Sequence, residues 1–197
     1  GLTFSPNITL ILINKSAALV GGSLAVTCFA PISYICSIII LLMQGVSDGS
    51  QPLISLTYGE GKISLTRTYR NMAYQFSLIV AALCMAALFF LRGYTAVLFG
   101  ASENISQQVG QILPIFLCGF LFISISRVST AYFYATRKNI WAYILIYGEP
   151  VSLLLLLLFM PSLTGGISGT WISVPLSQFT AAVISVILIL RDRNSDF

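Results

Sequence analysis

The sequence predicts an all-α integral membrane protein. Of its 197 residues, 57% are hydrophobic and only 8% are charged, and the mean hydropathy is +0.92. Soluble domains carry about 25% charged residues. The apolar residues gather in six long runs separated by short connections. Because lipid offers no hydrogen bonds to a bare backbone, such runs cross a membrane as helices.

The six runs predict one transmembrane lobe over residues 1–197. A spanning helix needs about 20 mostly apolar residues. The expected helices cover about 4–20, 24–58, 68–91, 109–135, 140–160 and 167–190. The second is too long for a simple perpendicular span, and Pro31 and Pro52 predict bends in it. The pair Gly21 and Gly22 is expected to end the first helix. We expect residues 191–197 to form a disordered cytoplasmic tail.

The distribution of basic residues predicts the orientation. If six helices alternate, one side of the membrane receives Lys62, Arg67, Arg70, Arg137, Lys138, Arg191 and Arg193. The other side receives Arg92 and Glu103. Because cytoplasmic connections are enriched in Lys and Arg, both termini of this segment are expected in the cytoplasm. The same rule explains the net charge of +4. We therefore expect the lipid bilayer, and not a nucleic acid, as the partner of these basic residues.

Several kinds of chemistry are disfavoured by the residues present. The chain has no histidine, and its four cysteines lie inside apolar runs without CxxC spacing. Zinc sites and Ser-His or Cys-His catalysis are therefore not expected. Residues 45–49 match the GxSxG pattern but lack its strand–turn–helix context and its histidine. We expect no enzyme activity, no cofactor and no metal site. The chain has no start methionine, and we expect it to be a piece of a longer protein.

Four ionisable residues fall within the predicted spans: Lys15, Asp48, Arg127 and Glu149. Each would cost roughly 2.5–3.5 kcal/mol at the centre of a lipid-facing helix, so they must be paired or hydrated. At about 1.5 Å per residue, their depths suggest the pairs Lys15–Glu149 and Asp48–Arg127, or one mixed cluster.

These charges have two interpretations. They could form buried salt bridges that fix helix packing, or a carboxylate could bind a coupling proton, Na⁺ or a cationic substrate. Glu149 is the stronger candidate because Pro150 frees a nearby backbone carbonyl. Asp48 lies among glycines and could serve similarly. The candidate ion- or substrate-binding residues are Glu149, Asp48, Lys15, Arg127, Gln51 and Asn14.

Three motifs resemble one transporter family. Residues 45–62, GVSDGSQPLISLTYGEGK, are similar to the segment that closes the eighth helix of multidrug and toxic compound extrusion (MATE) transporters. Residues 126–136, SRVSTAYFYAT, resemble the tenth helix of one bacterial branch, and residues 147–150, YGEP, resemble its eleventh. The resemblance covers essentially the whole chain.

The resemblance implies a twelve-helix transporter built from two six-helix lobes. This chain would be the carboxy-terminal lobe, its partner the missing amino-terminal lobe, and its location the plasma membrane of a bacterial cell. Family members exchange H⁺ or Na⁺ for small organic, mostly cationic compounds, including drugs. Several members carry acids in the seventh helix, where this chain has Lys15, Asn7 and Asn14. The coupling ion is therefore expected at Glu149 or Asp48, or in the absent half.

Two other functions stay open. A lipid-linked saccharide flippase of the same superfamily would need a more cationic cavity to hold a pyrophosphate. A non-transporting membrane scaffold should tolerate neutral substitutions of Glu149 and Asp48.

Overall fold

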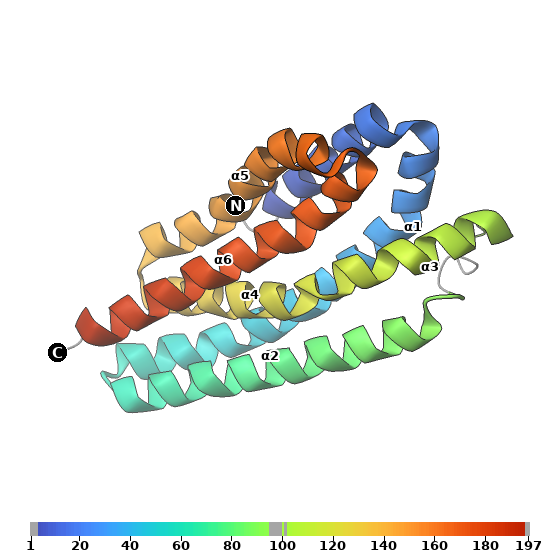
Figure 1. Cartoon of the computed structure of the whole chain (residues 1–197). Helices are drawn as coiled ribbons and strands as arrows, with labels where there is room; N and C mark the ends of the chain where they lie inside the picture. The colour runs from blue at the N-terminus through green and yellow to red at the C-terminus, as the bar shows by residue number, and fades with distance from the viewer. Residues whose placement is uncertain (1–3, 95–99, 101, 196–197) are drawn as a thin grey trace.

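The computed structural model describes residues 4–94, 100 and 102–195, and it folds them into six helices without a strand among them. The helices form one elongated bundle (Figure 1). Their bounds are α1 (Phe4–Gly59), α2 (Ile63–Leu91), α3 (Glu103–Leu117), α4 (Gly119–Ala135), α5 (Asn139–Thr164) and α6 (Ile167–Ser195). The all-α membrane fold that the composition predicts is therefore confirmed.

Helix α1 consists of two arms joined at Gly22. Gly22 has φ 66° and ψ −161°, a conformation that residues with a Cβ rarely adopt. The first arm covers residues 4–21 and the second covers residues 23–59, and Figure 1 shows the chain turning back between them. At about 1.5 Å per residue, the whole of α1 would span roughly 80 Å, well over the hydrocarbon thickness of about 30 Å. The break is what allows α1 to cross a membrane twice.

The prediction of one continuous helix over residues 109–135 is wrong. The structure has two helices there, α3 and α4, which meet at Cys118 with a bend of 41°. Pro114 removes one backbone donor from α3. Gly119 has no side chain, and the amide of Gln178 from α6 occupies the space: a Cβ at position 119 would lie 1.7 Å from Gln178 Oε1. The bend thus has a proline on one side and an inserted side chain on the other.

The disordered tail expected at 191–197 is also wrong for residues 191–195, because α6 continues to Ser195. Asp192 is buried and accepts a hydrogen bond of 2.8 Å at Oδ2 from Tyr132 Oη of α4. Its other oxygen pairs with the ammonium of Lys138, in the connection between α4 and α5. These contacts hold the last turns of α6 against the bundle. Residues 196 and 197 lie outside the described part of the chain.

The apolar core has two clusters at different levels of the bundle. One cluster, which we call the outer cluster, includes Phe29, Phe116 and Trp171, whose ring centroids lie 5.7–6.0 Å apart. The other, which we call the inner cluster, includes Ile54 and Phe133. Along α4, the stretch between the two clusters carries the buried polar residues Ser124, Ser126, Arg127, Ser129 and Thr130. The middle of the lobe is therefore its polar layer.

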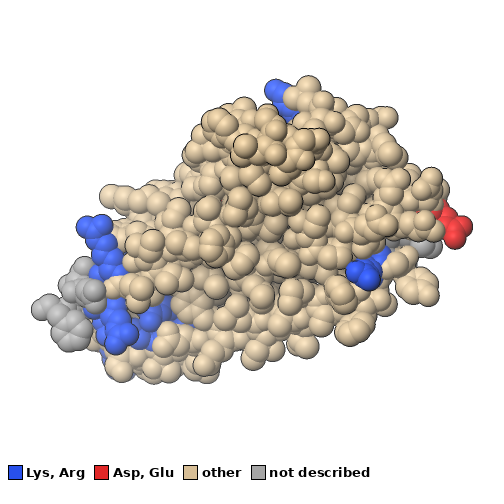
Figure 2. All heavy atoms as spheres, viewed as in Figure 1, with Lys and Arg blue, Asp and Glu red and all other residues tan. Residues whose placement is uncertain are grey.

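The surface of the bundle suits a lipid environment between two charged ends. Figure 2 shows Lys and Arg gathered at the end where α2 begins and α6 ends, and acidic atoms at the opposite tip. Large apolar side chains such as Ile79 and Leu83 are exposed between the ends. Within the described residues, four helices are long and apolar enough to cross a membrane, and the bent α3–α4 pair adds a fifth candidate if it counts as one span. The protein is a multi-pass membrane protein.

Candidate functional site

A cavity of about 490 Å³ occupies the polar layer, between both arms of α1 and helices α3 to α6. Its outer wall is apolar and carries the phenyl rings of Phe29, Phe116 and Phe120. Its polar lining consists mainly of Asn7, Thr9, Gln44, Asp48, Arg127, Glu149 and Gln178. The volume falls within the range of about 300–1,000 Å³ that small-molecule sites have. The cavity is thus a chamber with a polar floor and an aromatic wall.

Three charged side chains of the predicted site lie in this one cavity. Asp48 comes from the second arm of α1, Arg127 from α4 and Glu149 from α5. Arg127 is only 7% exposed, Glu149 is half-buried, and Asp48 is exposed at the lobe surface. With two carboxylates and one guanidinium, the formal charge of the cavity is −1. The structure brings together residues that are up to 101 positions apart in sequence.

Gln44 stands between Arg127 and Asp48, so the direct pair expected between them is wrong. Arg127 Nη1 donates to Gln44 Oε1 at 3.5 Å, and Gln44 Nε2 donates to Asp48 Oδ1 at 2.7 Å. Gln44 and Asp48 are four residues apart and therefore share a helix face. The neighbouring hydroxyls of Ser47 and Ser50 bond to backbone carbonyls of their own helix. The Gln44 amide thus connects the guanidinium to the carboxylate through two hydrogen bonds, in place of a direct ion pair.

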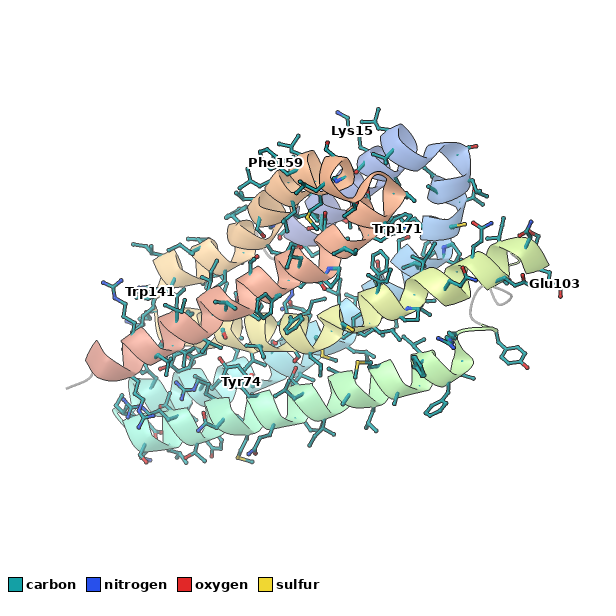
Figure 3. The ribbon with its side chains drawn as sticks, in the orientation of Figure 1. Lys15, Tyr74, Glu103, Trp141, Phe159 and Trp171 are labelled. Carbon is teal, nitrogen blue, oxygen red and sulfur yellow. The ribbon has the colours of Figure 1, made fainter. Side chains whose placement is uncertain are left out.

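The expected pair Lys15–Glu149 is wrong as well. Lys15 is exposed, and Figure 3 shows it pointing away from the bundle. The first arm of α1 is positioned by two contacts, Ser5 Oγ to Ile146 O at 2.8 Å and Ser16 Oγ to Thr170 Oγ1 at 3.0 Å. Its cavity face carries Pro6, Leu10 and Ile13, and Lys15 lies on another face. Arg127, and not Lys15, lines the same cavity as Glu149.

Lys15 also lies nearer to the membrane surface than the sequence predicts. The predicted depth counts residues from the cytoplasmic end of the first helix. Lys15 is seven residues before Gly22, or about 10 Å along the helix from the turn. A lysine stem can extend its ammonium from such a depth to the headgroup region. The lysine therefore needs no buried carboxylate as its partner.

Gln51 and Asn14 do not line the cavity either. Asn14 is exposed on the first arm of α1. Gln51 lies three residues beyond Asp48, toward the level of Ile54, where the inner apolar cluster packs. Sequence depth alone could not show where the cavity ends.

Four polar lining residues were absent from the candidate list: Asn7, Thr9, Gln44 and Gln178. Gln44 bridges Arg127 and Asp48. Its spacing of four residues from Asp48 indicates in the sequence that the two side chains share a helix face. Gln178 is 7% exposed, and its Oε1 atom has no hydrogen-bond partner among the described residues. It stands in an apolar run of α6, where a buried amide could have been noticed by the same reasoning that identified the charges. Its contact with Gly119 depends on the bend at Cys118 and could not be read from sequence.

The site offers oxygen ligands to a proton or a monovalent cation. Asp48 and Glu149 are its carboxylates, and Gln44 and Gln178 add amide groups. Within the part of the chain that the structure describes, no group of three or more His, Cys, Asp or Glu is placed to hold a metal ion. The arrangement suits reversible binding of charged groups in a partly buried chamber.

Comparisons with known proteins agree with this architecture. The MatE family model matches residues 4–160. The fold matches the outward-facing conformation of a multidrug resistance MATE family transporter of the MOP superfamily, at TM-score 0.89 and 19% identity. An inward-facing conformation of such a transporter matches at TM-score 0.85 and 18% identity. They cover 99% of this chain but only 44% and 45% of the solved chains.

A further structural match concerns a MOP superfamily transporter from Pyrococcus furiosus Vc1, in which a reversed polarity of the binding pocket suggests a different function. That chain is 20% identical at TM-score 0.89, with 98% of this chain and 44% of that one covered. A search of the curated proteins found no match to the chain. At these identities the solved structures support the fold, and the family model matches most of the chain. The chain therefore belongs to the MatE family, and its six helices have the fold of about half of a MATE transporter.

Proposed function

We propose that this chain is the carboxy-terminal lobe of an antiporter that exports small organic, mainly cationic compounds in exchange for H⁺ or Na⁺. The observation that carries the proposal is the cavity of about 490 Å³ that holds Asp48 and Glu149 within a membrane lobe. Acidic residues inside a membrane protein mark ion and substrate pathways. The missing partner is a second lobe, since the chain spans less than half of the transporters whose fold it shares.

Exchange follows if the coupling ion and the cargo compete for the same carboxylates. A proton or Na⁺ bound at Glu149 or Asp48 lowers the affinity for a cationic compound, and the cargo lowers the affinity for the ion by the same factor. An ion that enters down its gradient therefore displaces the cargo. The two lobes would alternate access to the shared pathway, while the cavity itself stays lined by the same residues.

The net charge of the cavity favours this function over the flippase alternative. Arg127 is its one cationic lining residue among those described, and two carboxylates outweigh it. A lipid-linked pyrophosphate would meet net repulsion there. No cofactor is needed for this mechanism. We place the protein in the plasma membrane of a bacterial cell, with the basic end of Figure 2 and both ends of this segment in the cytoplasm.

Dye efflux from cells tests the proposal. The full-length transporter that contains this lobe would be expressed as wild type, Glu149→Gln and Asp48→Asn, with proton and Na⁺ gradients imposed in turn. We expect at least one of the two variants to lose efflux about tenfold or more, because its carboxylate no longer binds the ion or the cargo. The matched control is Glu103→Gln, which neutralises an exposed acid at the far tip, where Figure 3 labels it.

The scaffold alternative predicts that the wild type exports no dye, while both neutral variants still reach the membrane. If both cavity variants reach the membrane at wild-type levels and export dye like the wild type under either gradient, the carboxylates do not couple transport. The gradient that supports efflux in the wild type identifies the coupling ion.

A further inference from the structure

Five charged residues meet at the basic end of the lobe, outside the cavity. The ion pair between Lys138 and Asp192 joins the connection after α4 to the last turns of α6. It brings Arg137 of that connection close to Arg191 and Arg193, the sequence neighbours of Asp192. We call the four basic residues the basic corner. With the one carboxylate, the group has a formal charge of +3, and Figure 2 shows Lys and Arg gathered at this end.

The carboxylate of Asp192 is already occupied by other partners. It is buried, its Oδ1 pairs with Lys138, and its Oδ2 accepts from Tyr132 Oη at 2.8 Å. Arg137 and Arg193 are exposed, and neither forms a hydrogen bond or an ion pair among the described residues. The positive charges of these two arginines are therefore not balanced within the described part of the chain.

The backbone at Arg137 is unfavourable for any side chain. Arg137 has φ 60°, in the left-handed region, and it is the one non-glycine residue with positive φ among those described. It follows the end of α4 at a position where glycine is common, and in the same turn Lys138 N donates to Phe133 O at 2.8 Å. An arginine there lowers backbone stability relative to glycine. A topology signal alone does not require this position, because a basic residue anywhere in the connection supplies it.

Trp141 indicates the depth of the basic corner in the membrane. It lies in the first turn of α5, and Arg191 Cζ is 5.6 Å from the centroid of its ring. A tryptophan at the end of a spanning helix lies at the level of the lipid headgroups. The cation–π contact therefore holds the Arg191 guanidinium where lipid phosphates are found. On the same helix, Ile140 and Ile144 are exposed and offer apolar surface to an acyl chain.

We propose that the basic corner and Trp141 form a binding site for an anionic phospholipid. The phosphate of the lipid accepts hydrogen bonds from the guanidinium groups of Arg137 and Arg191, whose planar forks suit phosphate oxygens. The acyl chains lie along the exposed face of α5, against Ile144. An occupied site ties the connection between α4 and α5 to the end of α6. The inference is independent of the proposed export function, because it concerns the outer surface of the lobe and not the cavity.

Fluorescence quenching by brominated lipids tests this inference. The full-length transporter, with Trp141 as its only tryptophan, would be placed in nanodiscs containing brominated phosphatidylglycerol or brominated phosphatidylcholine with identical acyl chains. A brominated chain quenches a tryptophan that it touches. We expect the anionic lipid to quench Trp141 at about one fifth of the lipid fraction that phosphatidylcholine needs. This preference should weaken at high salt, because salt screens the charges.

The variant Arg137→Gly separates lipid binding from folding. Glycine suits the left-handed backbone, so this variant should unfold in detergent at an equal or higher temperature than the parent protein. Its preference for the anionic lipid should nevertheless fall about twofold or more. Adding Arg191→Gln should abolish the preference. The matched control is Lys62→Gln, which removes an exposed lysine between α1 and α2 and should keep the full preference.

Three results would contradict the inference. Equal quenching by both lipids in the parent protein means that there is no site for an anionic lipid. An equal loss of preference in Lys62→Gln and Arg137→Gly means that the whole basic end attracts anionic lipid without a site. Displacement of the brominated lipid by glycerophosphoglycerol, the water-soluble headgroup, means that the site takes a free phosphate ester.

Native mass spectrometry gives the same comparison without replacing any tryptophan. The wild-type transporter should retain one more phosphatidylglycerol molecule than Arg137→Gly with Arg191→Gln. Equal lipid counts in the two proteins would rule the site out.

Discussion

At the scale of single residues, glycines decide how closely the helices approach. A Cβ at Gly169 would lie 2.5 Å from the backbone oxygen of Met160 and 2.4 Å from Thr164 Oγ1. A Cβ at Gly119 would meet the end of the flexible Gln178 side chain. A Cβ at Gly148 would meet nothing within 4 Å. The three positions therefore differ in what has to move when a methyl group is added.

This difference predicts an order of stability. Gly169→Ala should destabilise the fold most, by about 1–3 kcal/mol, because a backbone carbonyl must shift. Gly119→Ala should cost less, because the Gln178 amide can rotate away. Gly148→Ala serves as the control and should be neutral or slightly stabilising. Thermal unfolding of the purified variants would measure this, and an equal loss at positions 148 and 169 would contradict the packing of α5 against α6.

Single residues also show where sequence reasoning about the site works. Asp48, Arg127 and Glu149 stand out because a charge within a span is costly, and all three line one cavity. Lys15 has the same signal but lies on an exposed face, because its helix rotates it away from the cavity. Depth along a helix can be counted from sequence, whereas the direction of a side chain depends on which neighbour the helix packs against.

At the scale of elements, a buried polar contact ties the inner ends of the helices together. We define the inner clamp as Asp192, Lys138 and Tyr132: the carboxylate of α6 binds the ammonium between α4 and α5 and the hydroxyl of α4. Arg70 of α2 lies over the Tyr132 ring, with its Cζ 5.0 Å from the centroid. The clamp adjoins the inner apolar cluster, so it should keep this end of the lobe closed.

Breaking the inner clamp should therefore destabilise the lobe. Asp192→Ala removes the carboxylate that binds the Lys138 ammonium and the Tyr132 hydroxyl, at an expected cost of about 1–3 kcal/mol. The control is Glu60→Ala, which removes the exposed ion pair between Glu60 and Lys62 and should change the melting temperature little. Thermal unfolding of both variants checks the contrast. Equal melting temperatures would mean that the clamp adds no stability.

The two helix breaks, at Gly22 and at Cys118, differ in how well the sequence predicts them. Two adjacent glycines mark the turn in α1, and a positive φ at Gly22 is a local property of the backbone. The bend at Cys118 has a weaker local signal, since Pro114 alone does not fix its position. That bend is placed by the side chain of Gln178 from another helix, which lies 59 positions further along the chain than Gly119.

At the scale of the whole molecule, the charge asymmetry predicts how the lobe sits in the membrane. The end that carries the inner clamp also carries the Lys and Arg cluster of Figure 2, and the opposite tip carries Glu103. Because basic residues are retained in the cytoplasm, the clamp end should face inward. The aromatic wall of the cavity, formed with α3, then lies on the outer side.

Cysteine labelling in intact cells would measure this orientation. In a variant whose four native cysteines are replaced by alanine, Ser102→Cys should react with a membrane-impermeant maleimide. Ser64→Cys should react only after the membrane is permeabilised. Both serines are exposed, and they lie at the N-terminal ends of α3 and α2 respectively. The reverse labelling pattern would overturn the assigned orientation.

The sequence by itself determined the class of protein, the family and the residues worth examining. Hydrophobicity and charge are summed along the chain, so membrane crossing and the cost of buried charges can be read without coordinates. The tertiary structure decided the partners: Gln44 lies between Arg127 and Asp48, Gln178 lies in the bend at Cys118, and Asp192 of α6 binds Tyr132 of α4. Each of these contacts depends on helix rotation and register. Both are set by packing between distant segments, which no local pattern encodes.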